Sequence, residues 1–150
     1  MHQVDRTALV PYSPAEMFAL VADIERYPQF VPWVAEVEVL ERKPDEVVAR
    51  MHMERSGVRE KFTTRNVLSP PHRMDMHLVE GPFKSLEGRW TFEDIAGRGT
   101  RIGLSMSFEF ANPLVSMLLS RTFEKSCGQL VDAFVERAKA IHGSANRGAK

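Results

Sequence analysis

The sequence predicts an α+β domain in which a curved, seven-stranded antiparallel sheet wraps around a long C-terminal helix. Two helix starts, Ser13-Pro14 and Asn112-Pro113, each place a capping side chain before a proline. Between them, over 35–111, apolar and polar residues alternate with a period of two, which is typical of strands joined by short loops. A sheet of this kind buries one face against a helix. The 150 residues suffice for one domain, which we place at 1–143, with a flexible tail at 144–150.

A first strand is predicted at 3–11 and a helix over 14–24. Ser13 supplies a capping hydroxyl, and Glu16 follows three residues later as the partner in a capping box. Prolines after this helix prevent it from continuing. We therefore expect a second short helical turn within 25–33.

Six further strands are separated by turn-forming pairs such as Gly81-Pro82. Successive side chains of a strand point to opposite faces, and here the two faces differ strongly. In the last strand, for example, Met106 and Phe108 alternate with Ser105 and Ser107. One face of the sheet is therefore expected to be dry and the other wet. We place these strands at 35–42, 46–55, 58–68, 72–80, 84–94 and 100–111.

The longest helical pattern runs from 113 to about 141 and ends at Gly143. Its apolar residues recur at steps of three and four, which predicts one continuous buried stripe against the sheet. The stripe consists of Phe123, Cys127, Leu130, Val131, Phe134, Ala138 and Ile141.

The dry face of the sheet is rich in methionine, and two interpretations stay open. Sheet and helix enclose either a filled core or a cavity for a lipid-like ligand. Methionine is flexible and gives such a cavity a deformable lining. The methionines are Met51, Met53, Met74, Met76 and Met106 on the strands, with Met117 on the helix.

The fourth strand places polar side chains on the dry face. Glu60, Thr64 and Asn66 share the phase of Phe62. Buried polar groups need partners, so these three either pair with one another and with water or meet the polar head of a ligand. A register shift would instead turn them to solvent.

Two segments are more apolar than ordinary connections. One is Leu114–Leu119, which is apolar around its first helical turns, and the other is Tyr27–Trp33, which carries three aromatic residues on a proline-bent connection. Either both cap the ends of the core or they frame a cavity mouth. We expect Phe30–Trp33 to lie near Leu114–Leu119, to admit a ligand and to touch a membrane surface transiently.

Catalytic and metal-binding patterns are weak. The chain has no Gly-rich phosphate loop, no His-Glu-x-x-His and no Gly-x-Ser-x-Gly motif. Cys127 belongs to the buried stripe, where it acts as a small hydrophobe. His52 and His77 fall on non-adjacent strands, and Glu36 and Glu38 suit a solvated strand edge. We predict no catalytic residue and no metal site.

Composition narrows the partners and the compartment. Lys and Arg number 20 and Asp and Glu number 20, so there is no net positive field for general nucleic-acid binding. The single cysteine fits a reducing compartment, and no signal peptide or membrane-spanning run is evident. We expect a cytoplasmic protein, peripheral at the inner membrane if it collects lipid.

Several segments resemble, in order and spacing, the coenzyme Q-binding protein family of START-like domains. Bacterial members of that family are also labelled ribosome association toxins or polyketide cyclase/dehydrase-like proteins. The likeness covers about 3–142. Its motifs are Pro11-Tyr12-Ser13-Pro14-Ala15-Glu16-Met17-Phe18, Tyr27-Pro28-Gln29-Phe30-Val31-Pro32-Trp33, Glu60-Lys61-Phe62-Thr63-Thr64-Arg65, Gly81-Pro82-Phe83-Lys84-Ser85-Leu86 and Trp90-Thr91-Phe92.

The resemblance implies a helix-grip fold with an apolar tunnel. It also implies non-enzymatic binding of ubiquinone or another polyprenyl lipid in support of respiration, with no cofactor besides that lipid. An alternative is a toxin that binds the large ribosomal subunit, aided by basic residues at the end of the chain. A third is a cyclase-like enzyme with Glu60, Thr64 and Asn66 around a reactive carbonyl. The basic residues are Arg137, Lys139, Arg147 and Lys150.

The residues expected to line or gate the site combine the dry face with the two apolar segments. They are Phe30, Trp33, Met51, Met53, Phe62, Met76, Leu78, Phe83, Trp90, Phe92, Met106, Phe108, Met117, Leu118 and Phe123, with Glu60, Thr64 and Asn66 as polar contacts.

Overall fold

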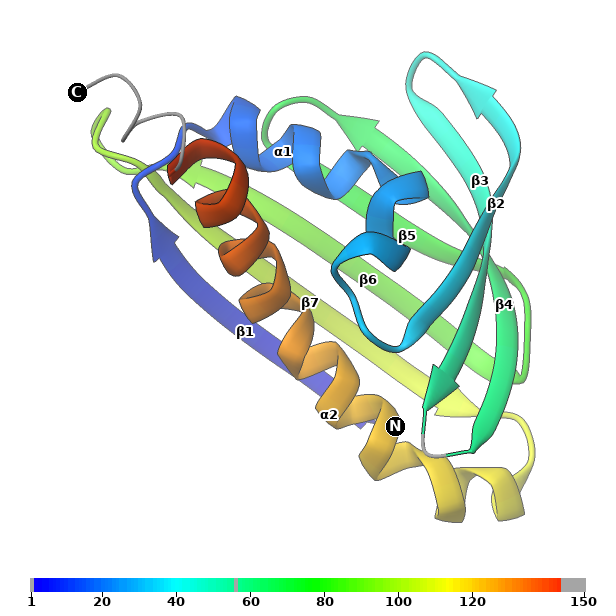
Figure 1. Ribbon diagram of the computed structural model, residues 1–150. Coiled ribbons are helices and arrows are strands. Elements are labelled where there is room, and N and C mark those ends of the chain that lie inside the picture. The colour runs from blue at the N-terminus through cyan, green and yellow to red at the C-terminus, as the bar shows by residue number, and fades with distance from the viewer. Residues whose placement is uncertain (1, 56, 144–150) are drawn as a thin grey trace.

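A computed structural model of the chain describes residues 2–55 and 57–143 and confirms the predicted fold class. Seven strands form one antiparallel sheet that curves around a long helix, α2 (Figure 1). The predicted tail at 144–150 lies outside the described residues. The strands are β1 (His2–Val10), β2 (Val34–Lys43), β3 (Glu46–Arg55), β4 (Val58–Ser69), β5 (Arg73–Glu80), β6 (Phe83–Asp94) and β7 (Thr100–Phe110).

The spatial order of the sheet is β1-β7-β6-β5-β4-β3-β2. Strands β2 to β7 form a meander, because each pairs with its neighbour in sequence. β1 pairs with β7, so the first two strands of the chain lie at opposite edges. The helices between them, α1 (Pro14–Ala22) and η1 (Ile24–Gln29), therefore bridge one end of the curved sheet (Figure 1).

The start of α1 follows the predicted capping chemistry. The Ser13 hydroxyl accepts a hydrogen bond from the Glu16 backbone N–H, and the Glu16 carboxylate accepts one from the Ser13 N–H at 3.0 Å. That backbone hydrogen bond lowers the pKa of Glu16. The expected second turn is the 3₁₀ helix η1, which contains Pro28.

Helix α2 (Pro113–Ala138) is capped by Asn112, whose side chain accepts hydrogen bonds from the backbone N–H groups of Leu114 and Val115. Most of the predicted stripe is buried, but Ile141 is 40% exposed, so its placement in the stripe was wrong. The chain changes to a π-helical turn over Lys139–Gly143, and the wider turn ends the 3.6-residue spacing on which that prediction depended. No helix in 2–55 or 57–143 is both long and apolar enough to cross a membrane.

Candidate ligand cavity

Two adjoining apolar chambers lie between the inner face of the sheet and α2. The inner chamber has a volume of about 60 Å³ and the outer chamber about 40 Å³. They share four lining residues, Met53, Phe62, Phe123 and Ser126. Further residues of the inner chamber are Ile24, Tyr27, Trp33, Val34, Ala49, Met51, Thr64, Asn66, Met74, Met76, Leu86, Gly88, Trp90, Met106, Cys127 and Leu130. Those of the outer chamber are Glu60, Pro82, Phe83, Phe110, Leu119 and Thr122.

Both chambers are much smaller than the roughly 300–1,000 Å³ of typical ligand pockets. The tunnel implied by the resemblance is therefore closed here, and flexible side chains fill it. Methionine ends meet over Gly88, where an added Cβ would lie 2.5 Å from the Met76 methyl carbon and 3.2 Å from that of Met106. The missing side chain at Gly88 thus gives these two thioethers their space. Because methionine changes rotamer easily, the same space can be opened by side-chain motion alone.

The inner chamber is polar at one place, on β4. The Thr64 hydroxyl donates to Asn66 Oδ1 at 3.3 Å, and Asn66 Nδ2 donates to the Val47 carbonyl at 3.1 Å. Asn66 is 2% exposed and Thr64 is buried beside it. The predicted pairing is confirmed for these two residues, and the irregularity of the β4–β5 register between Thr63 and Thr64 does not turn them outward. The amide of Asn66 can make one further hydrogen bond at each of its two polar atoms, and both residues line the inner chamber, where they can serve a polar ligand group.

Two titratable groups of the inner chamber are held neutral. Burial, followed by the charge of Glu124, raises the pKa of the Cys127 thiol to about 12, and the thiol donates to Met106 Sδ at 3.6 Å. Burial also raises the pKa of Tyr27, whose hydroxyl donates to the Val21 carbonyl. Neither group is an activated nucleophile or base at neutral pH.

The three polar residues named for cyclase-like chemistry do not converge. Glu60 lines the outer chamber, whereas Thr64 and Asn66 line the inner one. Four residues of a strand span about 13 Å, so the Glu60 carboxylate and the Thr64 hydroxyl cannot act on one carbonyl without a long reach. The geometry favours binding over general acid–base catalysis at this site.

Most of the predicted site residues are brought together by the fold. Nine of the apolar ones line one chamber or both, together with all three polar ones. These nine are Trp33, Met51, Met53, Phe62, Met76, Phe83, Trp90, Met106 and Phe123.

The others do not line either chamber, for different reasons. Phe92 and Phe108 are fully buried and pack against other aromatic rings, so they fill the core. Leu78 packs at the edge of the core and is half-buried. Met117 and Leu118 point outward from α2, with 74% and 67% of their surface exposed.

The expected proximity of Phe30–Trp33 to Leu114–Leu119 is wrong for Phe30. Its ring lies 5.1 Å from that of Phe134 and under the Arg137 guanidinium, in the C-terminal half of α2. Seventeen residues of helix separate Phe134 from Met117, a rise of about 25 Å. Proline bends direct the 27–33 segment along α2. The alternation of polar and apolar residues and the composition of the segment do not predict this direction.

Several lining residues were not predicted from the sequence. Some of them could have been predicted from helical spacing, whereas others depend on tertiary packing. Ser126 follows Phe123 by three residues, so helical spacing alone places it on the buried side of α2. Ile24 and Tyr27 reach the cavity only because η1 folds over the end of the sheet. Pro82, Leu119 and Thr122 meet only in tertiary structure.

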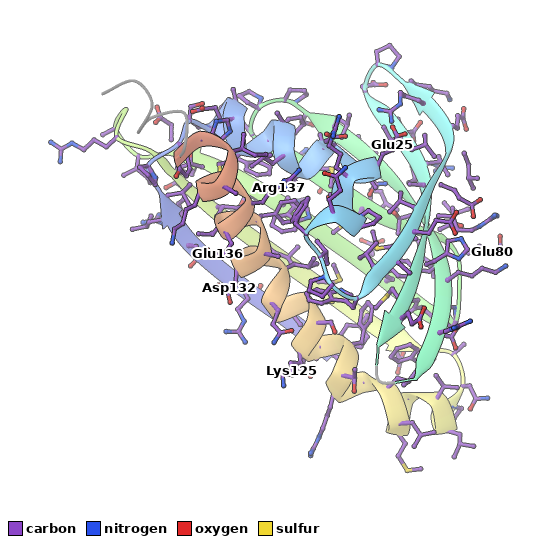
Figure 2. The ribbon with its side chains drawn as sticks, in the orientation of Figure 1. Glu25, Glu80, Lys125, Asp132, Glu136 and Arg137 are labelled. Carbon is purple, nitrogen blue, oxygen red and sulfur yellow. The ribbon has the colours of Figure 1, made fainter. Side chains whose placement is uncertain are left out.

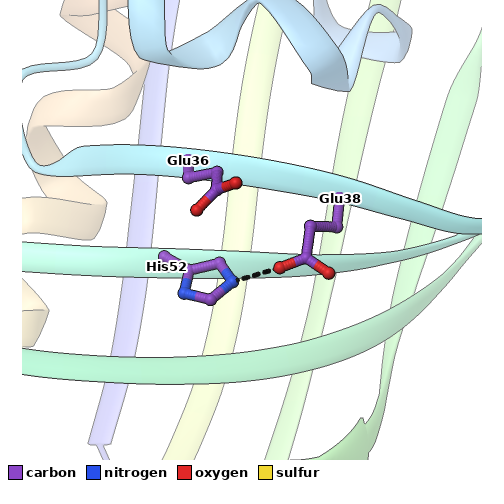
Figure 3. Close-up of side chains that lie close together, drawn as sticks. All are labelled: Glu36, Glu38 and His52. Atoms are coloured by element: carbon purple, nitrogen blue, oxygen red, sulfur yellow. Dashed lines mark hydrogen bonds and ion pairs between the residues drawn. The ribbon is translucent and has the colours of Figure 1, made fainter.

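The outer face of β2 and β3 carries a cluster of residues whose proximity was not predicted from the sequence. Ligand atoms of Glu36, Glu38 and His52 lie within 4.8 Å of one another (Figure 3). His52 Nε2 is 2.7 Å from Glu38 Oε1, and Arg50 Nη1 is 3.5 Å from Glu38 Oε2. A divalent cation would compete with Arg50 for the same carboxylate, so we describe the group as an ion-pair network.

The basic residues near the end of the chain are engaged where they are described. Arg137 donates to Gln29 Oε1 at 2.9 Å, and Lys139 pairs with Glu136 at 3.3 Å. Arg147 and Lys150 lie outside the described residues. Lys125, Asp132 and Glu136 are exposed along α2, so its surface carries both signs of charge (Figure 2).

Comparison with known proteins places this geometry in context. Residues 10–135 match the protein family described as polyketide cyclase / dehydrase and lipid transport. The chain is similar to the ribosome association toxin RatA of Escherichia coli strain K12, with 39% identity over 144 residues, 96% of this chain and 91% of the relative.

Two further similarities are more distant. The mitochondrial coenzyme Q-binding protein coq10 of Schizosaccharomyces pombe is 26% identical over 89% of this chain and 85% of its own. The crystal structure of the Zhui aromatase/cyclase from a Streptomyces species superposes with a TM-score of 0.81 at 20% identity, covering 92% of this chain and 93% of that one. At that identity the likeness extends to the fold alone.

Proposed function

Because the chain belongs to the polyketide cyclase / dehydrase and lipid transport family, within its RatA/Coq10-like START branch, we propose that it binds an amphiphilic lipid in its interior cavity. The proposed ligand is ubiquinone or another polyprenyl lipid. The role is that of a carrier or chaperone at a membrane surface, without a catalytic step.

One observation carries this proposal: an interior filled by five methionine side chains surrounds a small buried polar group. Met51, Met53, Met74, Met76 and Met106 all line the chambers, and the amide of Asn66 is the polar group. Burying each methylene of a ligand contributes about 0.8 kcal/mol. A prenyl tail that displaces flexible thioethers therefore gains affinity with few polar contacts.

The two tryptophans of the chain provide a direct assay, since both Trp33 and Trp90 line the inner chamber. A quinone bound there should quench their fluorescence with saturation. The matched control is the same benzoquinone ring without its tail, which should quench only by collision. Single Trp33→Phe and Trp90→Phe variants should each retain quenching of the remaining tryptophan. Linear, unsaturable quenching by the long-tailed quinone would contradict the proposal.

A complementary experiment identifies the native ligand. The protein is purified without detergent, extracted with organic solvent and analysed by mass spectrometry. Recovery of a prenyl quinone in stoichiometric amount is expected. Recovery of no lipid, together with no uptake of added quinone from vesicles, would overturn the proposal.

A second candidate function is association with the large ribosomal subunit, favoured by the 39% identity to a ribosome association toxin. Such binding would use the surface of the molecule, so it is compatible with a ligand inside. On the outer sheet face, arginines such as Arg65, Arg89 and Arg101 pair with carboxylates. RNA phosphates would have to replace those partners.

Cosedimentation with purified large subunits tests this candidate. Phosphate contacts release counterions, so binding should weaken by orders of magnitude between about 50 and about 200 mM salt. An Arg89→Glu, Arg101→Glu variant should bind less if the outer face is used. Protein that stays in the supernatant at low salt would rule the candidate out.

A further inference from the structure

The inner end of the cavity offers hydrogen bonds that the fold leaves unused. The Val47 carbonyl can only accept, so it fixes the Asn66 amide with Nδ2 toward Val47 and Oδ1 toward Thr64. Each of these atoms makes one side-chain hydrogen bond where the amide can make two. Asn66 therefore presents one N–H donor and one lone pair to the inner chamber, at a site where only 2% of its surface is exposed.

The outer end has the opposite character. Its chamber is lined by Pro82, Phe83, Phe110 and Leu119, and several of its lining residues are half-buried, so this end is the nearer to solvent. Just beyond Leu119 the surface of α2 is apolar, with Leu114, Met117 and Leu118 exposed. In Figure 1 this end of α2 lies beside the β5–β6 turn.

We propose that the ligand binds with its head inward: a carbonyl-bearing ring lies against Asn66 and Thr64, and its apolar tail runs outward past Met53 and Phe123 to the first turns of α2. This inference rests on the proposed lipid-binding function and adds the orientation and the class of head group. A ring carbonyl accepts from the free Asn66 N–H, and a ring hydroxyl donates to the free lone pair. Both the oxidised and the reduced form of a quinone therefore meet the requirement.

The opposite orientation is disfavoured by the chemistry of both ends. A tail-inward ligand would bury the Asn66 amide against methylenes and leave its free donor unsatisfied. It would also place the ring carbonyls in the outer chamber, where the Glu60 carboxylate is an acceptor and the donors among the lining side chains are the Thr122 and Ser126 hydroxyls. Length agrees with a head-inward ligand as well: six residues of strand, about 20 Å, separate Asn66 from Glu60. A long tail therefore reaches the outside.

Matched probes separate this inference from the function on which it rests. A decyl-substituted benzoquinone carries the head, whereas decylbenzene has the same tail and a ring without carbonyls. Affinities are measured by tryptophan quenching for the quinone and by competition for decylbenzene. Asn66→Leu should weaken quinone binding by about tenfold and leave decylbenzene binding unchanged. Thr64→Val keeps the Asn66–Val47 hydrogen bond, so it serves as the test variant if Asn66→Leu does not fold. It should weaken quinone binding severalfold.

The control variant is Ser107→Ala on the outer face of β7, which should change neither affinity. If both probes bind equally well to the parent protein and Asn66→Leu affects neither, the orientation is wrong while lipid binding stands. If neither probe binds, the proposed function itself fails.

A second measurement reports the direction. A quinone with a nitroxide at the end of a four-isoprene tail is added to protein labelled with ¹³C at its methionine methyl groups. The head-inward orientation predicts strong broadening of the Met117 signal and little broadening of Met74 and Met76. Strong broadening of Met74 and Met76 with an unaffected Met117 would reverse the orientation.

Discussion

Two regions of the inner face of the sheet, called here the rigid end and the methionine end, differ in the side chains that fill them. Under α1 and the C-terminal half of α2, rigid aromatic rings pack edge to face: Phe134 lies about 5 Å from the rings of Tyr27, Phe30 and Trp90. Toward β3–β5 the filling is methionine, with small spaces between the side chains. Aromatic rings fix one shape, whereas thioethers adopt several. We therefore expect the rigid end to stabilise the fold and the methionine end to rearrange when a ligand binds.

The largest effect on stability is expected when one aromatic ring is removed from the rigid end. Phe134 is fully buried, so Phe134→Ala should lower the free energy of unfolding by about 3–5 kcal/mol, because three rings lose their partner and cannot close the space. Chemical denaturation followed by circular dichroism measures this.

The matched variant at the other end is Met76→Ala. Met76 is half-buried and adjoins an existing space, so its loss should cost about 2 kcal/mol or less. Equal destabilisation by the two variants would mean that the ends do not differ in rigidity.

Cys127 lies on α2 beside the methionines and gives a pH-dependent prediction. Its pKa is raised from the usual 9.0 to about 12 in the folded protein, so between those values the folded state keeps a proton that the unfolded chain releases. This contribution to stability is complete below pH 9 and is lost as pH rises. By pH 10 the loss should reach about 1.4 kcal/mol.

Cys127→Ala should remove that slope between pH 9 and 10. Tyr27, whose pKa is also raised by burial, gives the same sign of dependence only from about pH 10 upward, so the window isolates the thiol. A variant with the same slope as the parent would show that the thiol is accessible to water.

The methionine end can be stiffened without removing volume. Met51→Leu with Met76→Leu conserves size, so the free energy of unfolding should change by about 1 kcal/mol or less. Leucine has fewer rotamers that open the chambers, so quinone uptake measured by tryptophan quenching should slow severalfold. Leu68→Met, at a partly buried position that does not line the chambers, is the control and should leave uptake unchanged. Uptake at the parent rate in the stiffened variant would mean that the cavity opens by motion of backbone elements instead.

The sequence predicted the fold nearly completely, because its signals are local. Capping by Ser13 and Asn112 marked both helix starts, and period-two alternation assigned the inner faces of β3, β5, β6 and β7 correctly. The exception was Ile141, just beyond the C-terminal end of α2, since a π-helical turn has no comparable signature in composition.

The site was predicted less well, because alternation gives the face of a residue and not its position along the sheet. Phe92 and Trp90 share one face of β6, yet only Trp90 lines the cavity, because Phe18 of α1 packs against Phe92. Where α1 and η1 cross the sheet depends on tertiary packing. The polar pair Thr64 and Asn66 was found because its residue types contradict the dry phase of their strand.

The smallest effect on stability is expected at the apolar first turns of α2, where we expect the exposed side chains to contribute to ligand transfer but little to the packing of the core. Met117 and Leu118 are mostly exposed, so Met117→Ser with Leu118→Ser should change the free energy of unfolding by no more than about 0.5 kcal/mol. The same variant should lose apolar contact with a membrane surface and with the outer part of a long tail, so transfer of a long-tailed quinone between vesicles should slow. Leu119→Ser is the contrasting variant: its side chain lines the outer chamber, so it should cost more stability. If the double variant unfolds readily while its folded fraction transfers quinone at the parent rate, the exposed turns support the core and the ligand leaves elsewhere.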